Sequence, residues 1–307
     1  MMTLPFRVHI HLGAHKTATT FIQNGLAQQH AWLRERHIAY IPLHRLRQEF
    51  TPCFWELTNG QAADPAALMA RMRTLLLANI EASGYKVDDT RLLILSEENL
   101  LGALGALYHR GVLYPDLAKR MQYLAEIFQG CEVQAFLSVR NYRDFYASAY
   151  AEVLRQGWVK PMDQFVAKLD LSGNTWSNVV AAIEAALGPV TVWPYEQFRS
   201  HTGEIISALL QAEVGEGFLG KQTVRPSLTQ KGLAVAMACR DVLEPANLKK
   251  LVNTLVDKVV FEQPDGRIVL GDDGGIGALE ARYWEELEGL GEKSWMGLSS
   301  GGLDSRI

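Results

Sequence analysis

The chain has few cysteines, and this shortage excludes two classes of protein. Among 307 residues there are three cysteines, Cys53, Cys131 and Cys239, which lie far apart. An odd number of distant cysteines fits neither a disulfide framework nor the ligand spacing of a zinc site. We therefore expect free thiols and a reducing, cytoplasmic environment.

An excess of positive charge and long apolar runs are also missing. The chain has 30 Lys and Arg against 34 Asp and Glu, a formal net charge of −4. No global basic field is therefore available to hold nucleic acid or an anionic membrane, and any anion site must be local. No run approaches the roughly 18 apolar residues of a spanning helix, and the first residues resemble neither a signal peptide nor an anchor. We expect no nucleic-acid partner and no membrane span; the oligomeric state stays open.

Apolar runs and helical patterns alternate along the first two-thirds of the chain, and 48% of all residues are hydrophobic. The predicted strands are Phe6–Leu12, His37–Ile41, Arg91–Leu95, Val133–Val139 and Val190–Trp193. The predicted helices are Thr17–Arg36, Pro65–Ser83, Pro115–Phe128, Arg143–Gln156 and Thr175–Leu187. Nearly continuous apolar strands that alternate with helices predict a three-layer α/β/α fold around a central, mostly parallel sheet.

The rest of the chain is predicted to be mostly helical. Residues 203–290 form this helical part, interrupted by a flexible break at Gly271–Gly277 (GDDGGIG), before a last helix in ALEARYWEELEGL. We expect residues 1–290 to form a single domain and residues 291–307 to form a flexible tail.

The segment GAHKTATTFIQ follows the first predicted strand and opens the first predicted helix. Backbone amides at a helix start lack partners within the helix, and the helix dipole adds partial positive charge there. Gly13 permits close approach of a ligand, Lys16 adds a cation, and Thr17, Thr19 and Thr20 offer hydroxyl donors. The pattern predicts a phosphate-binding turn; a capped helix start with a surface lysine is the alternative.

A second cluster of polar residues, VRNYRDFYASAY, follows the fourth predicted strand. Arg140 lies at the carboxyl end of that strand, on the edge where open α/β sheets bind ligands. Ser148 lies about two helical turns further on. An arginine fork and a serine hydroxyl can converge on one phosphate. Pairing of Arg140 and Arg143 with Asp144 or Glu152 on a solvated helix face is the alternative.

Together the two segments resemble the sulfotransferase family that uses 3′-phosphoadenosine-5′-phosphosulfate. HLGAHKTATTFIQ is similar to the family's 5′-phosphosulfate loop, H-x-G-x-x-K-T-G-T-T with a following glutamine, and VRNYRDFYASAY is similar to its 3′-phosphate motif. IAYIP, ILSEENL and VTVWPYEQF agree with bacterial members. The resemblance implies a fold like that of the P-loop NTPases. Ala18 stands where the family usually has glycine, and a need for positive φ there would weaken donor binding.

The resemblance implies transfer of a sulfuryl group from this donor to a hydroxyl or amine of a sugar, lipid or small molecule, with 3′-phosphoadenosine-5′-phosphate as product. Lys16 is expected to hold the 5′-phosphate and to neutralise the charge that develops on its bridging oxygen. Arg140 and Ser148 are expected to hold the 3′-phosphate. The residues expected to bind the nucleotide are Gly13, Ala14, His15, Lys16, Thr17, Ala18, Thr19, Thr20, Arg140, Ser148 and Arg225.

A catalytic base is expected in ILSEENL, just past a buried strand. Burial there would raise the pKa of a carboxylate toward the range useful to a general base. The related pattern S-x-E-N favours Glu98 over Glu97, while helix capping is the structural alternative for both. His11 and His15 flank the first loop, and a packed role is expected for each. No metal is expected.

A later basic segment, GKQTVRPSLTQKG, is the last candidate part of the site. By resemblance, Arg225 and Ser227 would extend the 3′-phosphate site; a solvated basic loop is the alternative. Two other functions compete with the sulfotransferase interpretation. A P-loop kinase or nucleotidase would need Mg²⁺ held by Thr17 and an acidic residue. A non-catalytic nucleotide-binding protein would bind the nucleotide without transferring sulfate.

Overall fold

The chain folds around one sheet of five parallel strands. The computed structural model describes residues 4–158, 160–221, 227–259, 266–271 and 278–290. The strands of its sheet are β1 (Arg7–His11), β2 (Ile38–Tyr40), β3 (Leu92–Ser96), β4 (Val133–Val139) and β5 (Val190–Pro194). Their order is β2-β3-β1-β4-β5, and every neighbouring pair is parallel. All five predicted strands are present, and the predicted α/β class with a central parallel sheet is confirmed.

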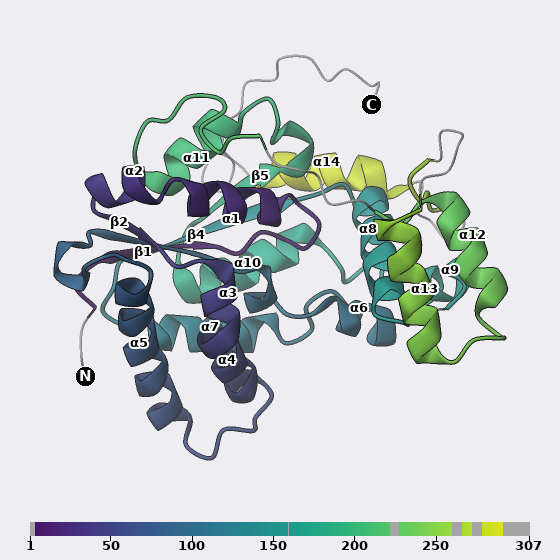
Figure 1. Cartoon of the computed structure of the whole chain (residues 1–307), viewed down its shortest axis with the longest axis horizontal. Helices are drawn as coiled ribbons and strands as arrows, with labels where there is room; N and C mark the ends of the chain where they lie inside the picture. The colour runs from purple at the N-terminus through teal and green to yellow at the C-terminus, as the bar shows by residue number, and fades with distance from the viewer. Residues whose placement is uncertain (1–3, 159, 222–226, 260–265, 272–277, 291–307) are drawn as a thin grey trace.

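Helices cover both faces of this sheet, as the unbroken apolar strands require. Helices α1 (Thr19–Gln28) and α11 (Thr202–Leu210) lie on one face, and α5 (Pro65–Ala82), α7 (Leu117–Ile127) and α10 (Trp176–Leu187) lie on the other (Figure 1). The central strand residues of β1 and β3 are fully buried between the two layers. The three-layer arrangement therefore follows from the strand composition.

Helix boundaries agree with the sequence except where the predicted first helix breaks. The structure ends α1 at Gln28 and begins α2 (His30–Glu35) two residues later. Gln29 between them has φ −93° and ψ 20°, outside the helical range, and its N–H bonds to the Leu26 carbonyl. The single helix predicted over Thr17–Arg36 was therefore wrong at this joint.

Several short helices were not predicted. A 3-residue turn of helix, α3 (Leu43–Arg45), leads into a π-helical stretch, η1 (Leu46–Phe50), and then into α4 (Thr51–Thr58). Helices α6 (Leu104–Arg110) and α9 (Met162–Val166) were also missed, as were the 3₁₀ turns η2 (Val87–Asp89), η3 (Glu98–Leu100) and η4 (Tyr195–Gln197). The π-helical stretch matters most, because such stretches occur often at functional sites.

Helices dominate the described part of the chain after β5, as predicted. Beside α11 these are α12 (Gln230–Cys239), α13 (Pro245–Asp257) and α14 (Leu279–Gly289), which lie with α8 (Tyr142–Arg155) beyond the sheet (Figure 1). Residues 272–277 of the predicted glycine-rich break, and the predicted tail at 291–307, lie outside the described residues.

Glu286 of α14 connects this last helix by hydrogen bonds to α8 and to α10, which covers one face of the sheet. Its Oε2 accepts hydrogen bonds from the Tyr142 hydroxyl at 2.7 Å and from the Trp176 backbone N–H at 2.9 Å. Trp176 is the first residue of α10, so the carboxylate satisfies a donor at a helix start and complements the helix dipole. Trp176 itself is fully buried.

The three cysteines are free thiols, as expected from their spacing. No helix in the part of the chain that the structure describes has the length and apolar character needed to cross a membrane.

Candidate functional site

The two predicted motifs meet at the sheet edge where the strands end. The chain leaves β1 toward β2 on one side of the sheet and leaves β4, its neighbour, toward β5 on the other. Such a switch point opens a crevice at the carboxyl ends of the strands. There the Arg140 Nη1 donates to the Lys16 carbonyl oxygen at 3.0 Å, across 124 residues of sequence. The structure therefore brings the two motifs into contact.

The β1–α1 loop (residues 12–18) holds three residues in the left-handed region. The φ angles are 38° at Gly13, 69° at Lys16 and 62° at Ala18. Ala18 directly precedes α1 and stands where the resembled motif has glycine. The position does require positive φ, and a Cβ there costs roughly 1–2 kcal/mol. Strain of this kind concentrates at ligand-binding sites.

The position of Gly13 has no room for a side chain, because two polar atoms lie close to it. A Cβ built there would lie 2.9 Å from His11 Nε2 and 2.9 Å from Thr19 Oγ1. Both atoms are buried and have no hydrogen-bond partner among the described residues. Because buried polar groups are nearly always paired, the two unpaired atoms mark a place where a ligand would complete them, and Gly13 has no side chain to cover them. We call these three residues the Gly13 cradle.

The His11 side of the cradle is a neutral imidazole. Burial lowers the pKa of His11 to about 4, against a smaller opposing effect of Glu98. Its Nδ1 lies 2.8 Å from the Ser96 hydroxyl, and its ring stacks on Trp193 with 5.6 Å between centroids. When the hydroxyl donates to Nδ1, Nε2 carries the proton and is a donor toward the cradle.

The other two threonines of the loop do not contribute donors to the Gly13 cradle. Thr17 is buried, and its hydroxyl donates to the Ala14 carbonyl at 2.5 Å, which closes the loop on itself. Thr20 is exposed on the first turn of α1. Of the three predicted hydroxyl donors, the structure leaves Thr19 buried and without a described partner.

Lys16 pairs with an acid from the other motif. Its Nζ lies 3.0 Å from the Glu152 Oε2, and the two side chains are 27% and 25% exposed. Glu152 lies on α8, the helix that follows Arg140. The cation predicted to bind an anion is therefore held beside the loop by a carboxylate that an anionic ligand would have to replace.

Arg140 is buried and held in a fixed plane. Its guanidinium lies over the Tyr195 ring, 4.7 Å from the centroid, and its Nη2 is 3.7 Å from the Asp144 carboxylate. Its Nε is buried and lacks a hydrogen-bond partner in the described part of the chain. The planar guanidinium in this setting is already oriented to donate hydrogen bonds to the oxygens of a phosphate.

Ser148 lies on the face of α8 that contacts both cations. Asp144, Ser148 and Glu152 are spaced four residues apart, so their side chains share one helix face. Asp144 contacts Arg140, and Glu152 contacts Lys16. The partly exposed Ser148 therefore lies between the two cations along this face.

Glu97 is a fully paired buried carboxylate. Its side chain is 1% exposed, and it accepts two hydrogen bonds from Arg47, from Nε at 2.9 Å and from Nη2 at 2.8 Å. The Thr51 hydroxyl donates to it at 3.2 Å and the Asn99 backbone N–H at 3.1 Å. We call these four residues the Glu97 cluster. Its geometry is that of a structural contact between β3, η1 and α4.

Glu98 has fewer contacts, but the prediction of a raised pKa was wrong. Burial alone would raise the pKa of this carboxyl; the charges of His15 and Arg47 and hydrogen bonds, including one from Gln23, outweigh it, so the pKa lies below its ordinary value. The Arg47 Nη2 donates to Oε1 at 2.9 Å, and the Gln23 Nε2 donates to Oε2 at 3.2 Å. Glu98 is therefore an ionised hydrogen-bond acceptor at neutral pH.

The histidines near the loop pack against protein groups and do not converge on one point. His15 Nδ1 lies 2.9 Å from the Tyr114 hydroxyl and its Nε2 lies 3.4 Å from Asn99 Oδ1. His9 Nδ1 lies 2.7 Å from the Leu209 carbonyl on α11. In the described ranges, no group of His, Cys, Asp or Glu is placed to hold a metal ion.

Arg225 lies outside the described residues, so its expected contact with the 3′-phosphate stays a prediction. Ser227, which is described, is exposed. Sequence reasoning missed Arg47, Tyr195 as the platform under Arg140, and Glu152 as the partner of Lys16. A signal existed for Glu152 alone, because it lies four residues after Ser148 on the same helix face.

Comparison with known proteins shows distant structural similarities. No protein-family profile and no curated relative matches the sequence. A sulfotransferase domain from the curacin biosynthetic pathway is 12% identical, with a TM-score of 0.37, over 72% of this chain and 80% of that one. A chain from the PezAT chromosomal toxin–antitoxin system of Streptococcus pneumoniae is 14% identical, with a TM-score of 0.29, over 83% of this chain and 90% of that one.

Proposed function

We propose that the chain is a sulfotransferase that takes a sulfuryl group from 3′-phosphoadenosine-5′-phosphosulfate and passes it to an acceptor hydroxyl. One observation carries the proposal: two cation-bearing motifs meet at the switch point of a parallel sheet, beside a cradle of unpaired buried polar atoms. A phosphate group at a helix start needs such donors and such charge.

The Gly13 cradle and the loop backbone would hold the 5′-phosphosulfate. Thr19 Oγ1 and His11 Nε2 supply two buried donors that no described residue uses. Preorganised donors in a dry site stabilise developing charge more strongly than water does. Their unpaired state is the feature that a bound phosphate oxygen would relieve.

Lys16 would stabilise the leaving phosphate. In the transfer, the acceptor oxygen bonds to sulfur, the bond from sulfur to the bridging oxygen breaks, and charge grows on that oxygen. A lysine ammonium is a compact charge suited to this position. Lys16 would exchange its contact with Glu152, 3.0 Å away, for this oxygen.

Arg140 and Ser148 would recognise the 3′-phosphate. The Tyr195 ring and Asp144 hold the guanidinium in place while its Nε keeps an unused proton. The acceptor proton would pass to Glu98, which accepts one hydrogen bond on each oxygen and is 16% exposed, whereas Glu97 accepts four hydrogen bonds and is 1% exposed.

Binding calorimetry with matched nucleotides tests the proposal. We expect 3′,5′-bisphosphoadenosine to bind without magnesium and to outcompete both its 2′,5′ isomer and ATP. A kinase would instead prefer ATP with Mg²⁺. Preference for Mg-ATP, or no nucleotide binding, would overturn the assignment. Transfer of labelled sulfate from the donor to any acceptor then separates an enzyme from a nucleotide-binding protein without activity.

Arg140→Ala tests the second motif separately. The variant is expected to lose about 2–5 kcal/mol of affinity for 3′,5′-bisphosphoadenosine, the range typical of losing one partner of a buried charge pair. Its affinity for 5′-AMP, which lacks the 3′-phosphate, should change little. Arg110→Ala, at an exposed position on α6, is the control. Equal losses for both nucleotides would show that Arg140 acts on the fold and not on the 3′-phosphate.

A further inference from the structure

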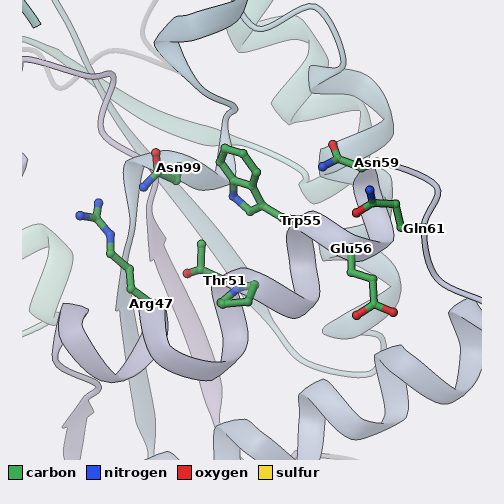
Figure 2. Close-up of a pocket in the computed structure, with 8 residues that line it drawn as sticks. Arg47, Thr51, Trp55, Glu56, Asn59, Gln61 and Asn99 are labelled. Atoms are coloured by element: carbon green, nitrogen blue, oxygen red, sulfur yellow. The ribbon is translucent and has the colours of Figure 1, made fainter. Parts of the chain in front are cut away.

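A cavity of about 740 Å³ opens beside the Glu97 cluster, three of whose four residues line it. It lies between η1, α4 and η3 (Figure 2). Its lining residues are Arg47, Thr51, Pro52, Trp55, Glu56, Asn59, Gln61 and Asn99. Its volume falls within the roughly 300–1,000 Å³ of small-molecule sites. We call it the Trp55 pocket.

Two contacts join this pocket to the candidate site. Asn99 lines the pocket, and its Oδ1 lies 3.4 Å from His15 Nε2 in the β1–α1 loop. Arg47 lines the pocket and donates to the Glu98 carboxylate at 2.9 Å. A molecule in the pocket would therefore be one side chain away from both the loop and the carboxylate.

The charges of the pocket disfavour an anionic ligand. The guanidinium of Arg47 is compensated by Glu97 at 2.8 Å and by Glu98 at 2.9 Å. The other charged lining residue is Glu56, an exposed carboxylate. The lining residues thus supply no uncompensated cation. Next to them, the Arg120 guanidinium lies 5.8 Å from the centroid of the Trp55 ring, and its N–H groups donate to the Leu100 and Asn99 carbonyl oxygens and to the Thr58 hydroxyl. A negatively charged ligand would meet the carboxylate of Glu56 and, beyond Arg47, those of Glu97 and Glu98.

The neutral lining groups suit hydroxyls above a flat apolar face. Asn59, Gln61 and Asn99 present side-chain amides, each with donors and an acceptor. The indole of Trp55 stands between them in Figure 2. Amides that bond hydroxyls, beside an aromatic ring that covers C–H groups, match the two faces of a sugar ring.

We propose that the Trp55 pocket binds the acceptor and that this acceptor is a neutral carbohydrate. The inference rests on the proposed sulfotransferase activity and names its substrate class. A sugar hydroxyl directed out of the pocket toward His15 bonds to the sulfur of the donor. The bond from sulfur to the 5′-phosphate oxygen breaks, the hydroxyl proton passes to Glu98, and the electron pair leaves with 3′-phosphoadenosine-5′-phosphate.

Saturation-transfer NMR with matched sugars tests the ligand class. The probes are the methyl glycosides of glucose and galactose and their uronate counterparts, which have the same ring and one added carboxylate. With 3′,5′-bisphosphoadenosine present, we expect the neutral glycosides to bind and the uronates to bind at least tenfold more weakly. Absence of binding by the neutral glycosides, or equal binding by the uronates, would overturn the proposal, as would sulfate transfer to 4-nitrophenol or octanol alone.

Variants locate the binding to this pocket. Trp55→Ala should weaken glycoside binding by roughly tenfold, which corresponds to about 1.4 kcal/mol, because the sugar loses both the aromatic contact and the area buried against it. Trp55→Phe should retain most of the binding. Gln61→Ala should weaken it about fivefold, the equivalent of one net hydrogen bond. Gln129→Ala, an exposed glutamine after α7, is the matched control and should change nothing.

The two proposals fail in different ways. If the wild-type chain does not bind 3′,5′-bisphosphoadenosine, the sulfotransferase proposal falls, and the glycoside titration without nucleotide still decides the ligand class of the pocket. If the nucleotide binds but Trp55→Ala leaves glycoside binding unchanged, the pocket assignment alone falls. Nucleotide affinity should be the same in wild type and in the Trp55 and Gln61 variants.

Discussion

The loops after β1 and β3 begin at the same level of the sheet but use their polar atoms in opposite ways. His11 and Ser96, which end the two strands, are paired in register. After β1, His11 Nε2 and Thr19 Oγ1 are buried without a described partner. After β3, Arg47, Thr51 and the Asn99 N–H occupy both oxygens of Glu97.

Whether a buried polar atom already has a partner within the fold distinguishes ligand-binding residues from structural residues better than the residue type does. A carboxylate at a strand end resembles a catalytic group in sequence, yet Glu97 already has its partners within the fold. Gly13 and Thr19 are less conspicuous, yet beside the glycine the buried His11 Nε2 and Thr19 Oγ1 are without a described partner. Because unpaired buried groups cost free energy, they mark where a ligand would complete the site.

Breaking the Glu97 cluster should have the largest effect. Arg47→Met removes the ion-pair partner of a carboxylate that is 1% exposed, while Arg47 itself is 41% exposed. We expect a loss of about 3 kcal/mol in the free energy of unfolding, at the low end of the range for buried pairs because of that exposure. Urea denaturation measures it.

The double variant Arg47→Met, Glu97→Gln is the control for this interpretation. Without the charge on residue 97, most of the lost stability should return. A double variant as unstable as Arg47→Met would show that packing of the arginine stem, and not the buried charge, explains the loss.

His11, at the end of β1, is predicted to make the free energy of unfolding depend on pH. Burial lowers the pKa of His11 to about 4 from the ordinary 6.5. Between pH 6.5 and 4, His11 is protonated in the unfolded chain but not in the folded chain. The contribution of His11 to the free energy of unfolding is therefore complete above pH 6.5 and is lost as the pH falls toward 4. Between pH 7.5 and 5 we expect a loss of roughly 2 kcal/mol from this residue alone.

His11→Gln isolates that contribution, since glutamine does not titrate. Its unfolding free energy should fall less steeply than that of the wild type over the same range. Parallel curves for the two proteins would mean that His11 is protonated at the same pH in the folded and unfolded states.

Ala18→Gly relieves strain in the β1–α1 loop and has a smaller effect. Residue 18 has φ 62°, where glycine carries no Cβ penalty. We expect a gain of about 1 kcal/mol in unfolding free energy, with tighter nucleotide binding if the loop also relaxes. Ala70→Gly, exposed in the interior of α5, should instead lose about 1 kcal/mol. A loss of stability in both variants would show that the backbone of Ala18 is not strained.

The sheet could be predicted from the sequence because its strands are short, apolar and buried on both faces. Val133–Val139 was predicted with the bounds that the structure shows. The region from Leu43 to Thr58 could not be predicted, because it folds as α3, a π-helical stretch and α4 in direct succession. The local sequence does not encode that register, which depends on contacts such as that between Arg47 and Glu97.

The site could be predicted only as far as its local motifs reach. The positions of Lys16 and Arg140 follow from strand ends, so their meeting at one edge was foreseeable. The contacts that their side chains make could not be foreseen. The pairing of Lys16 with Glu152 joins residues 136 apart, and the pKa of Glu98 depends on Arg47 and His15. Such contacts arise from tertiary packing, which no local pattern contains.

The pairing of Lys16 with Glu152 gives the smallest and most specific effect. Glu152→Gln removes the carboxylate that neutralises Lys16 in the free chain, so an anion no longer has to displace it. Since both side chains are about one-quarter exposed, the pair is worth only about 0.2–1 kcal/mol. We therefore expect 3′,5′-bisphosphoadenosine to bind about 1.4- to fivefold more tightly. In Lys16→Ala the same Glu152→Gln change should have no effect, because the cation it would free is absent. An equal gain in affinity in both backgrounds would show that Glu152 repels the ligand directly. Weaker binding in Glu152→Gln would show instead that Glu152 positions Lys16 beside the loop.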